Sequence, residues 1–195
     1  MRKIFVILFL SVTFALQAQS SVEDVSKALN ALGAYQATLN IISQGESITG
    51  EYQVDGELIY LNLEGVEFYS DGELRYQIDN SSRSVIVDLL PQEQSSMLLD
   101  NPASAFDSIL GVYDEELVFR DRVQSVIQLN AKGGDIAVGM ITLVVDVATS
   151  LPKSIDYQAE GESVVIEFIS IEALGGDVRQ FSKDNYPDYE IVDFR

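Results

Sequence analysis

The chain alternates apolar and polar residues in a long series of short segments separated by turn residues. Six such segments carry apolar side chains at a spacing of two and occupy residues 35–41, 48–54, 58–63, 66–69, 74–78 and 84–87. Pairs such as Asp55-Gly56 and Asp71-Gly72 stand between them, and tight hairpins favour these residues. A spacing of two places one set of side chains on one face of a strand. The pattern therefore predicts an antiparallel meander with one apolar face.

A second series of alternating segments predicts five more strands. They occupy residues 116–120, 125–129, 140–146, 154–158 and 163–171. The most apolar stretch, 138–147, has a length that suits a buried strand or a buried helix, and its β-branched residues favour the strand. A sheet of about eleven strands curls or closes instead of remaining flat.

Three segments have the spacing of helices. Residues 22–32 repeat apolar side chains at helical spacing between the N-cap residue Ser21 and the helix-ending Gly33. Two short helices are predicted over 92–99 and 102–110, between the two series of strands. Their apolar sides suit a cover over a concave sheet.

The amino terminus has the composition of a secretory signal peptide. A basic start precedes an apolar run at 4–10, and Ala18 marks the predicted cleavage site. The alternative, an anchoring helix, would need about 20 apolar residues to span a bilayer. We therefore expect residues 1–18 to be removed, and residues 19–195 to form one domain in the periplasm.

The charge of the chain limits its partners. It has 12 basic and 31 acidic residues, a formal net charge of −19. Such a surface repels nucleic acid and anionic lipid headgroups, which argues against either as a direct partner. After the first 18 residues no apolar stretch is long enough to span a bilayer, so we expect no nucleic-acid partner and no stable membrane insertion. The acidic residues either keep the protein soluble or steer a basic partner, and the sequence leaves both open. The absence of cysteine removes the residue that is lipidated in lipoproteins.

The residue types also limit the chemistry. Histidine, cysteine and tryptophan are absent, and with them the commonest general base, the soft metal ligands and the thiol nucleophile. The densest acidic stretches, Glu115-Glu116 and residues 184–193, lack the spacing of a calcium loop. The chain contains no nucleophile elbow, phosphate loop or dinucleotide fingerprint. We expect no catalytic residues, metal or cofactor, and a protein that is not an enzyme.

Several local patterns, taken in order, carry a resemblance to a known family. Residues 68–79 form an aromatic hairpin around an Asp-Gly turn, Asn101-Pro102 opens a helical segment, and residues 143–155 contain a strand, a Leu-Pro turn and a strand. Together with the closing residues 181–193, they make the chain resemble the LolA-like periplasmic lipoprotein carriers over most of residues 22–195. The chain lacks the early Arg-Pro pair of the best-known carriers, so the resemblance implies no arginine-dependent lid switch.

The resemblance implies a fold and a function. The fold would be mainly β with a few helices, an incomplete, unclosed antiparallel β-barrel of about eleven strands with a helical lid, as in LolA and LolB. The function would be to bind the acyl chains of lipoproteins and shuttle them, as a monomer, from an inner-membrane lipoprotein-releasing transporter to an outer-membrane acceptor. An envelope protein-interaction or sensor module, or a binder of another lipid, is the alternative on the same fold.

We assign a hydrophobic cup to one face of the predicted strands and a lid to the helix pair. The cup residues are Leu39, Ile41, Tyr52, Leu61, Phe68, Tyr76, Val87, Ile127, Leu143, Val145, Ile166 and Phe168. The lid residues are Met97, Leu98, Phe106 and Ile109. The same residues would pack on one another in a filled barrel, and the sequence leaves that alternative open.

Overall fold

The computed structural model describes residues 20–90, 106, 109–133, 139–159 and 161–195. The elements of this part of the chain are α1 (Val22–Leu32), β1 (Tyr35–Ser43), β2 (Glu46–Asp55), β3 (Leu58–Leu63), β4 (Val66–Ser70), β5 (Leu74–Asp79), β6 (Ser84–Leu89), the 3-10 helix η1 (Ile109–Gly111), β7 (Tyr113–Arg120), β8 (Gln124–Ala131), β9 (Met140–Asp146), β10 (Pro152–Ala159), β11 (Glu162–Ala173), the 3-10 helix η2 (Lys183–Asn185) and β12 (Glu190–Asp193). No helix in these ranges is long and apolar enough to cross a membrane.

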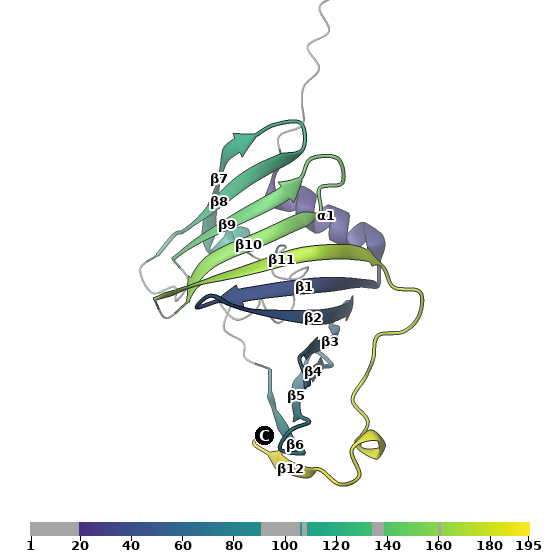
Figure 1. The fold of residues 1–195 in the computed structure, drawn as a ribbon. Helices are drawn as coiled ribbons and strands as arrows, with labels where there is room; N and C mark the ends of the chain where they lie inside the picture. Colours follow the sequence, from purple (N-terminus) through teal and green to yellow (C-terminus); the bar gives the residue numbers. More distant parts are fainter. Residues whose placement is uncertain (1–19, 91–105, 107–108, 134–138, 160) are drawn as a thin grey trace, which may run out of the picture.

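The strands form one sheet of twelve, in the order β12-β6-β5-β4-β3-β2-β1-β11-β10-β9-β8-β7 (Figure 1). β1 pairs with β2 on one side and with β11 on the other, so the two meanders join through β1. Neighbouring strands are antiparallel except for β12, which runs parallel to β6. The ends of the order, β12 and β7, are not paired with each other. The expectation of a mainly β, unclosed antiparallel barrel is confirmed.

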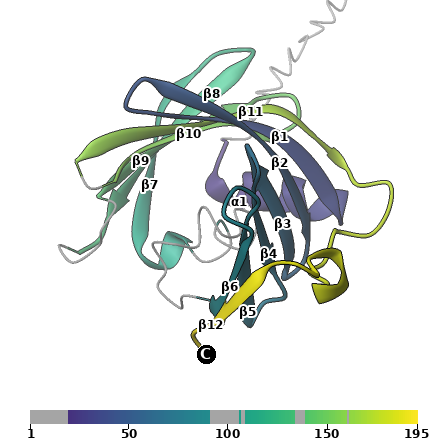
Figure 2. The ribbon, with the colours of Figure 1, turned by 60° about the horizontal axis from the view of Figure 1, so that its bottom comes forward.

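The first helix begins and ends as the sequence predicts. The Ser21 hydroxyl accepts a hydrogen bond from the Asp24 backbone N–H at 3.2 Å, and the Asp24 carboxylate accepts one from the Ser21 backbone N–H at 3.1 Å. This reciprocal pair is a capping box. Gly33 ends the helix with a φ of 68°, which disfavours residues with a side chain. Val25 and Leu29 are buried, and Figure 2 shows the sheet curving around α1.

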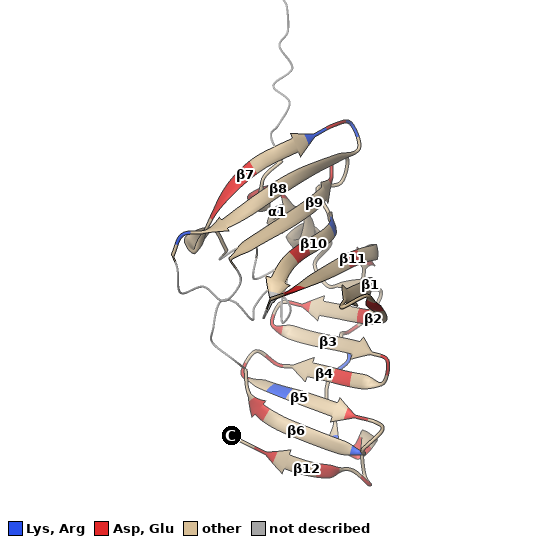
Figure 3. Ribbon diagram, turned by 60° about the vertical axis from the view of Figure 1, so that its left-hand side comes forward, with Lys and Arg blue, Asp and Glu red and all other residues tan. Residues whose placement is uncertain are grey.

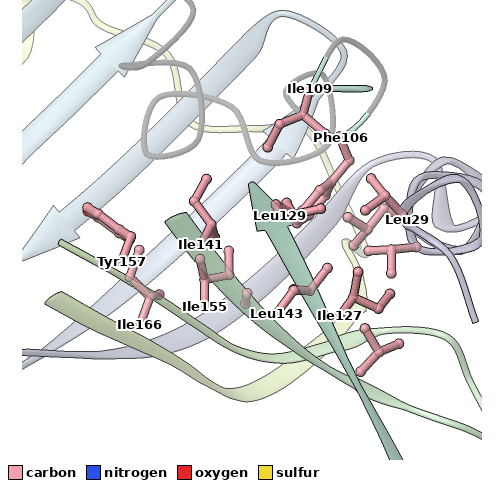
Figure 4. Close-up of a cluster of buried hydrophobic side chains, with 14 of the residues drawn as sticks. Leu29, Phe106, Ile109, Ile127, Leu129, Ile141, Leu143, Ile155, Tyr157 and Ile166 are labelled. Carbon is pink, nitrogen blue, oxygen red and sulfur yellow. The ribbon is translucent and has the colours of Figure 1, made fainter. Parts of the chain in front are cut away.

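The main hydrophobic core lies on the concave face of the sheet, where β8 to β11 and β1 meet α1. Figure 4 shows Leu29 of α1 and Phe106 close to Leu129 and Ile127 of β8. Side chains in this region are almost completely removed from water, and Leu143 is 0% exposed. Burying a side chain of this size contributes roughly 1.5–3 kcal/mol.

A second cluster covers the outer face of β3 to β6. It comprises Tyr60, Tyr69, Ile78, Val85, Val87, Val178 and Tyr186, with Tyr76, Phe181 and others packed against it. Phe181 from the C-terminal segment stacks on Tyr76, with 4.3 Å between ring centroids, and on Tyr186 at 5.8 Å. The C-terminal segment thus closes this face with its own aromatic side chains before it enters β12.

The strand β12 is the main departure from the predicted elements. The sequence suggests a mixed tail after residue 181, in which Pro187 limits regular structure. The structure places Glu190 opposite Ser84 and Asp193 opposite Val87. β12 is a strand because it forms hydrogen bonds with β6. Since β6 is distant along the chain, the local sequence of the short segment does not indicate a strand.

The other predicted strands are confirmed, several with longer bounds. The predicted signal peptide, the helix at 92–99 and most of the helix at 102–110 lie outside the described residues. Of this second helix, Phe106 is helical and Ile109 begins η1.

Candidate ligand-binding pocket

A cavity of about 470 Å³ opens on the concave face beside the packed core. Most of its walls come from β1 to β4, with one residue each from β5, β10 and β11 and one that follows β6, and they are mainly apolar. The lining residues are Ile41, Ser43, Tyr52, Ile59, Leu61, Leu63, Phe68, Tyr69, Ser70, Arg75, Leu90, Tyr157 and Val164.

The strand register explains why these residues meet. Leu61 on β3 lies opposite Tyr52 on β2 and Phe68 on β4. Residues opposite each other in a sheet point to the same face, so the three form a row across the pocket floor. In the next row, Gly50 lies opposite Leu63, and a Cβ atom there would stand 2.5 Å from Leu63 Cδ2. The glycine therefore leaves room for the Leu63 side chain at the pocket wall.

The polar part of the lining is concentrated at the β4–β5 side. Ser70 lies opposite Arg75, and Arg75 lies opposite Asp88 on β6. The Arg75 guanidinium donates to the Asp88 carboxylate twice, from Nε to Oδ1 at 3.1 Å and from Nη2 to Oδ2 at 2.7 Å. Each of the two side chains is 29% exposed. Figure 3 shows the basic residue of β5 as a blue segment beside β6, in a molecule whose charges are mostly acidic.

Tyr157, which lines the pocket, stays neutral at ordinary pH. Burial raises the pKa of Tyr157 to about 12. Tyr69 also lines the pocket, but its hydroxyl lies on the outer face, where it is hydrogen-bonded to Tyr186 and Glu67, and burial together with these bonds raises its pKa. Within the described ranges, no cluster of three or more acidic residues could hold a metal ion. The arrangement suits the binding of an apolar group, and its polar groups suit hydrogen bonding to a ligand.

The structure brings four of the predicted cup residues together at this cavity. Ile41, Tyr52, Leu61 and Phe68 all line it. Their use in binding a ligand stays a prediction, but their common position is a feature of the fold.

Five other predicted cup residues belong to the core instead. Leu39, Ile127, Leu143, Val145 and Ile166 are buried in the main hydrophobic cluster, and Phe168 is partly buried against it. They share the concave face with the pocket, as predicted, but α1 and its neighbours pack over this part of the sheet.

The expectation that Tyr76 and Val87 face the cup is wrong. Tyr76 lies opposite Tyr69 and Val87, while Phe68 lies opposite Gln77. The concave side of β5 therefore carries Arg75 and Gln77, and Tyr76 points to the outer face, where Phe181 stacks on it. The aromatic residue gave the stronger apolar signal, but the register of the hairpin assigned it to the other face.

The predicted lid is described only in part. Met97 and Leu98 lie outside the described residues. Phe106 and Ile109 are 2% and 5% exposed and belong to the main core.

Sequence reasoning missed several of the lining residues. Ile59, Leu63 and Val164 follow the same alternation as the residues that were chosen, so the spacing of two could have found them. Arg75 and Ser70 carry no apolar signal, and only the pairing of β4 with β5 reveals their place.

Comparison with known proteins concerns the fold. The sequence matches no protein-family model and no curated protein. Among solved structures, an uncharacterized conserved protein from Thermus thermophilus is 11% identical with a TM-score of 0.56, over 88% of this chain and 96% of that chain. A LolA superfamily protein from Nitrosomonas europaea is 11% identical with a TM-score of 0.40, over 85% and 94%. LprF from Mycobacterium bovis is 11% identical with a TM-score of 0.45, over 82% and 94%. Of these three, the Thermus thermophilus protein has a TM-score above 0.5, and at 11% identity that likeness describes the fold alone.

Proposed function

We propose that the protein binds acyl chains in the concave pocket and carries them through the periplasm. The observation that carries the proposal is the apolar cavity of about 470 Å³, whose walls include Ile41, Leu61 and Phe68. Small-molecule sites are typically concave, mainly apolar and about 300–1,000 Å³ in volume. A cavity of this kind takes a hydrophobic chain without a catalytic group.

The energetics suit a carrier that releases its cargo. Each methylene moved from water into an apolar pocket contributes about 0.8 kcal/mol. Loss of translational freedom and of chain flexibility offsets a large part of that gain. A ligand held on the open side of a sheet is therefore bound with moderate affinity, and transfer to an acceptor remains accessible.

Lipoproteins are the cargo that we favour. The support is the resemblance of the sequence to LolA-like carriers. In this scheme residues 1–18 are removed on secretion, and the mature protein receives a lipoprotein from an inner-membrane transporter and delivers it to an outer-membrane acceptor. Amino-terminal sequencing of the mature protein should begin at or near Gln19, and recovery of an intact Met1 would contradict this.

Mass spectrometry of the protein purified from its own envelope tests the function. We expect co-purified lipoprotein, or its acyl chains, with the wild-type protein and a marked loss with Leu61→Gln in the pocket wall. Leu89→Gln is the matched control, because the Leu89 side chain is exposed and is not part of the pocket lining. Phospholipid without lipoprotein would assign the pocket to another lipid. A co-purified protein without any acyl chain would favour the interaction module and contradict the proposal.

A further inference from the structure

The concave face changes from apolar to polar across neighbouring strands. One row of opposite residues runs Ile59, Ser70, Arg75 and Asp88 from β3 to β6. The adjacent row begins with Leu61 and Phe68 and continues with Gln77 on β5 and Ile86 on β6. Residues opposite each other share a face, so the apolar floor over β2 to β4 borders hydrogen-bonding side chains on β5 and β6.

The charge at this border is balanced or negative. The two hydrogen bonds between Arg75 and Asp88 make a charge-neutral pair. Beyond Gln77, the next residue on the same side of β5 is Asp79, whose carboxylate accepts hydrogen bonds from Ser81 and Ser82 in the β5–β6 turn. The chain as a whole has a net charge of −19. An anionic group at this border would meet repulsion or would compete with Asp88 for the guanidinium.

An uncharged or zwitterionic group meets neither obstacle. The Ser70 hydroxyl and the Gln77 amide can each donate and accept a hydrogen bond. A head group that carries hydroxyls, or a zwitterionic head group with a phosphodiester and an amine, can form hydrogen bonds with these side chains while Arg75 and Asp88 remain paired.

We infer, on the premise of the proposed function, that the pocket selects amphiphiles by their heads: the acyl chain lies over β1 to β4, and an uncharged or zwitterionic head lies over Ser70, Arg75 and Gln77. A chain that ends in a free anionic head is bound more weakly. The neutral Arg75–Asp88 pair is the element that sets this preference.

Three probes with one lauroyl chain test the preference: monolauroylglycerol, lauroyl lysophosphatidylcholine and laurate. Isothermal titration calorimetry on the mature protein, with each probe below its micellar concentration, measures the affinities. We expect the uncharged and zwitterionic probes to bind about tenfold more tightly than laurate, the effect of one unfavourable charge contact.

The variant Asp88→Asn tests the cause of the preference. It removes the Asp88 carboxylate, which accepts two hydrogen bonds from the Arg75 guanidinium, so laurate should bind about tenfold more tightly than to the wild-type protein. Monolauroylglycerol should change by less than about twofold, since its head carries no charge. The control Asp188→Asn makes the same change in net charge on the exposed C-terminal segment and should leave both affinities unchanged.

The outcomes separate this inference from the function on which it rests. Wild-type binding of laurate as tight as that of monolauroylglycerol, with both probes weakened by Leu61→Gln, would overturn the head preference and leave the acyl-chain pocket standing. Failure of all three probes to bind would overturn both. Circular dichroism verifies that Asp88→Asn is folded, and if it is not, the order of the three probes on the wild-type protein decides.

Discussion

Two parts of one concave face use the same kind of residue for opposite purposes. Leu143 on β9 and Leu61 on β3 both belong to alternating strands and point to the inside of the curved sheet. Leu143 is 0% exposed within a core that includes side chains of α1, whereas Leu61 lines a cavity of about 470 Å³. The strand pattern is therefore not what distinguishes a packed core from a pocket. The difference lies in what packs over each part: the cluster that contains Leu143 also includes Leu29 of α1, Phe106 and Ile109.

The largest expected effect is a loss of stability from a substitution in the main hydrophobic core. Leu143→Ala removes buried methyl groups from the main core and should lower the free energy of unfolding by about 2–5 kcal/mol. Denaturant unfolding measures this loss, and affinity for a lauroyl probe per folded molecule should stay the same. Leu89→Ala, at an exposed leucine, is the control and should change stability by less than about 0.5 kcal/mol. A lost affinity in folded Leu143→Ala would mean that the core and the pocket act as one cavity.

A second prediction adds the outer face to the comparison. Phe181→Ala removes the ring that stacks on Tyr76 and Tyr186, and each aromatic pair contributes about 0.5–1.5 kcal/mol beyond its burial. We expect a stability loss of about 2 kcal/mol by denaturant unfolding, with probe affinity unchanged. Phe119→Ala, at a half-exposed ring on β7, should cost less. Weakened binding in the Phe181 variant would show that the C-terminal segment supports the pocket through the sheet.

A substitution at the pocket should give the reverse result, with a larger effect on ligand affinity than on stability. Phe68→Gln places a polar side chain at the pocket wall, where water can reach it, so the stability loss should be about 1 kcal/mol or less. Affinity for a lauroyl probe should fall about tenfold, which corresponds to about 1.4 kcal/mol. Phe194→Gln makes the same change at an exposed ring and serves as the control. Strong destabilisation with unaltered affinity would mean that Phe68 belongs to a filled barrel.

The smallest expected effect is a pH dependence that belongs to the outer face. Burial acts to raise the pKa of the Glu67 carboxyl, but hydrogen bonds from Asn80 and Tyr69 outweigh it and hold the pKa below the ordinary 4.5. The folded state thus binds this proton less readily than the unfolded state. The ionised Glu67 carboxylate therefore contributes to folding stability. This contribution is complete above pH 4.5 and is lost as the pH falls through the lowered pKa of the folded state. It should amount to less than about 1 kcal/mol because the carboxyl is partly solvated.

Unfolding measured across the acid range, for wild type and Glu67→Gln, tests this dependence. The variant should lose less stability than the wild type as the pH falls below 4.5. Equal slopes in the two proteins would assign the acid sensitivity to other carboxylates.

Most of the secondary structure could be read from local signals. The alternation at residues 58–63 and the Asp-Gly turns predicted strands and hairpins because each signal spans only a few neighbouring residues. The same holds for α1, whose cap at Ser21 and end at Gly33 are encoded beside the helix. β12 was not predictable in this way, because its partner β6 is distant in sequence.

The candidate site was predictable only in part, for a reason that Tyr76 and Leu143 make plain. Sequence alone determined that the chain forms short strands with an apolar face, and it named Leu61 and Phe68 among the residues of that face. The tertiary structure decided that Leu143 is enclosed in a core shared with α1 and Phe106, that the hairpin register turns Tyr76 outward, and that Arg75 meets Asp88 at the pocket. Alternation reports which side chains avoid water, whereas a pocket depends on which of them a distant segment leaves uncovered, and that is settled only when the elements pack together.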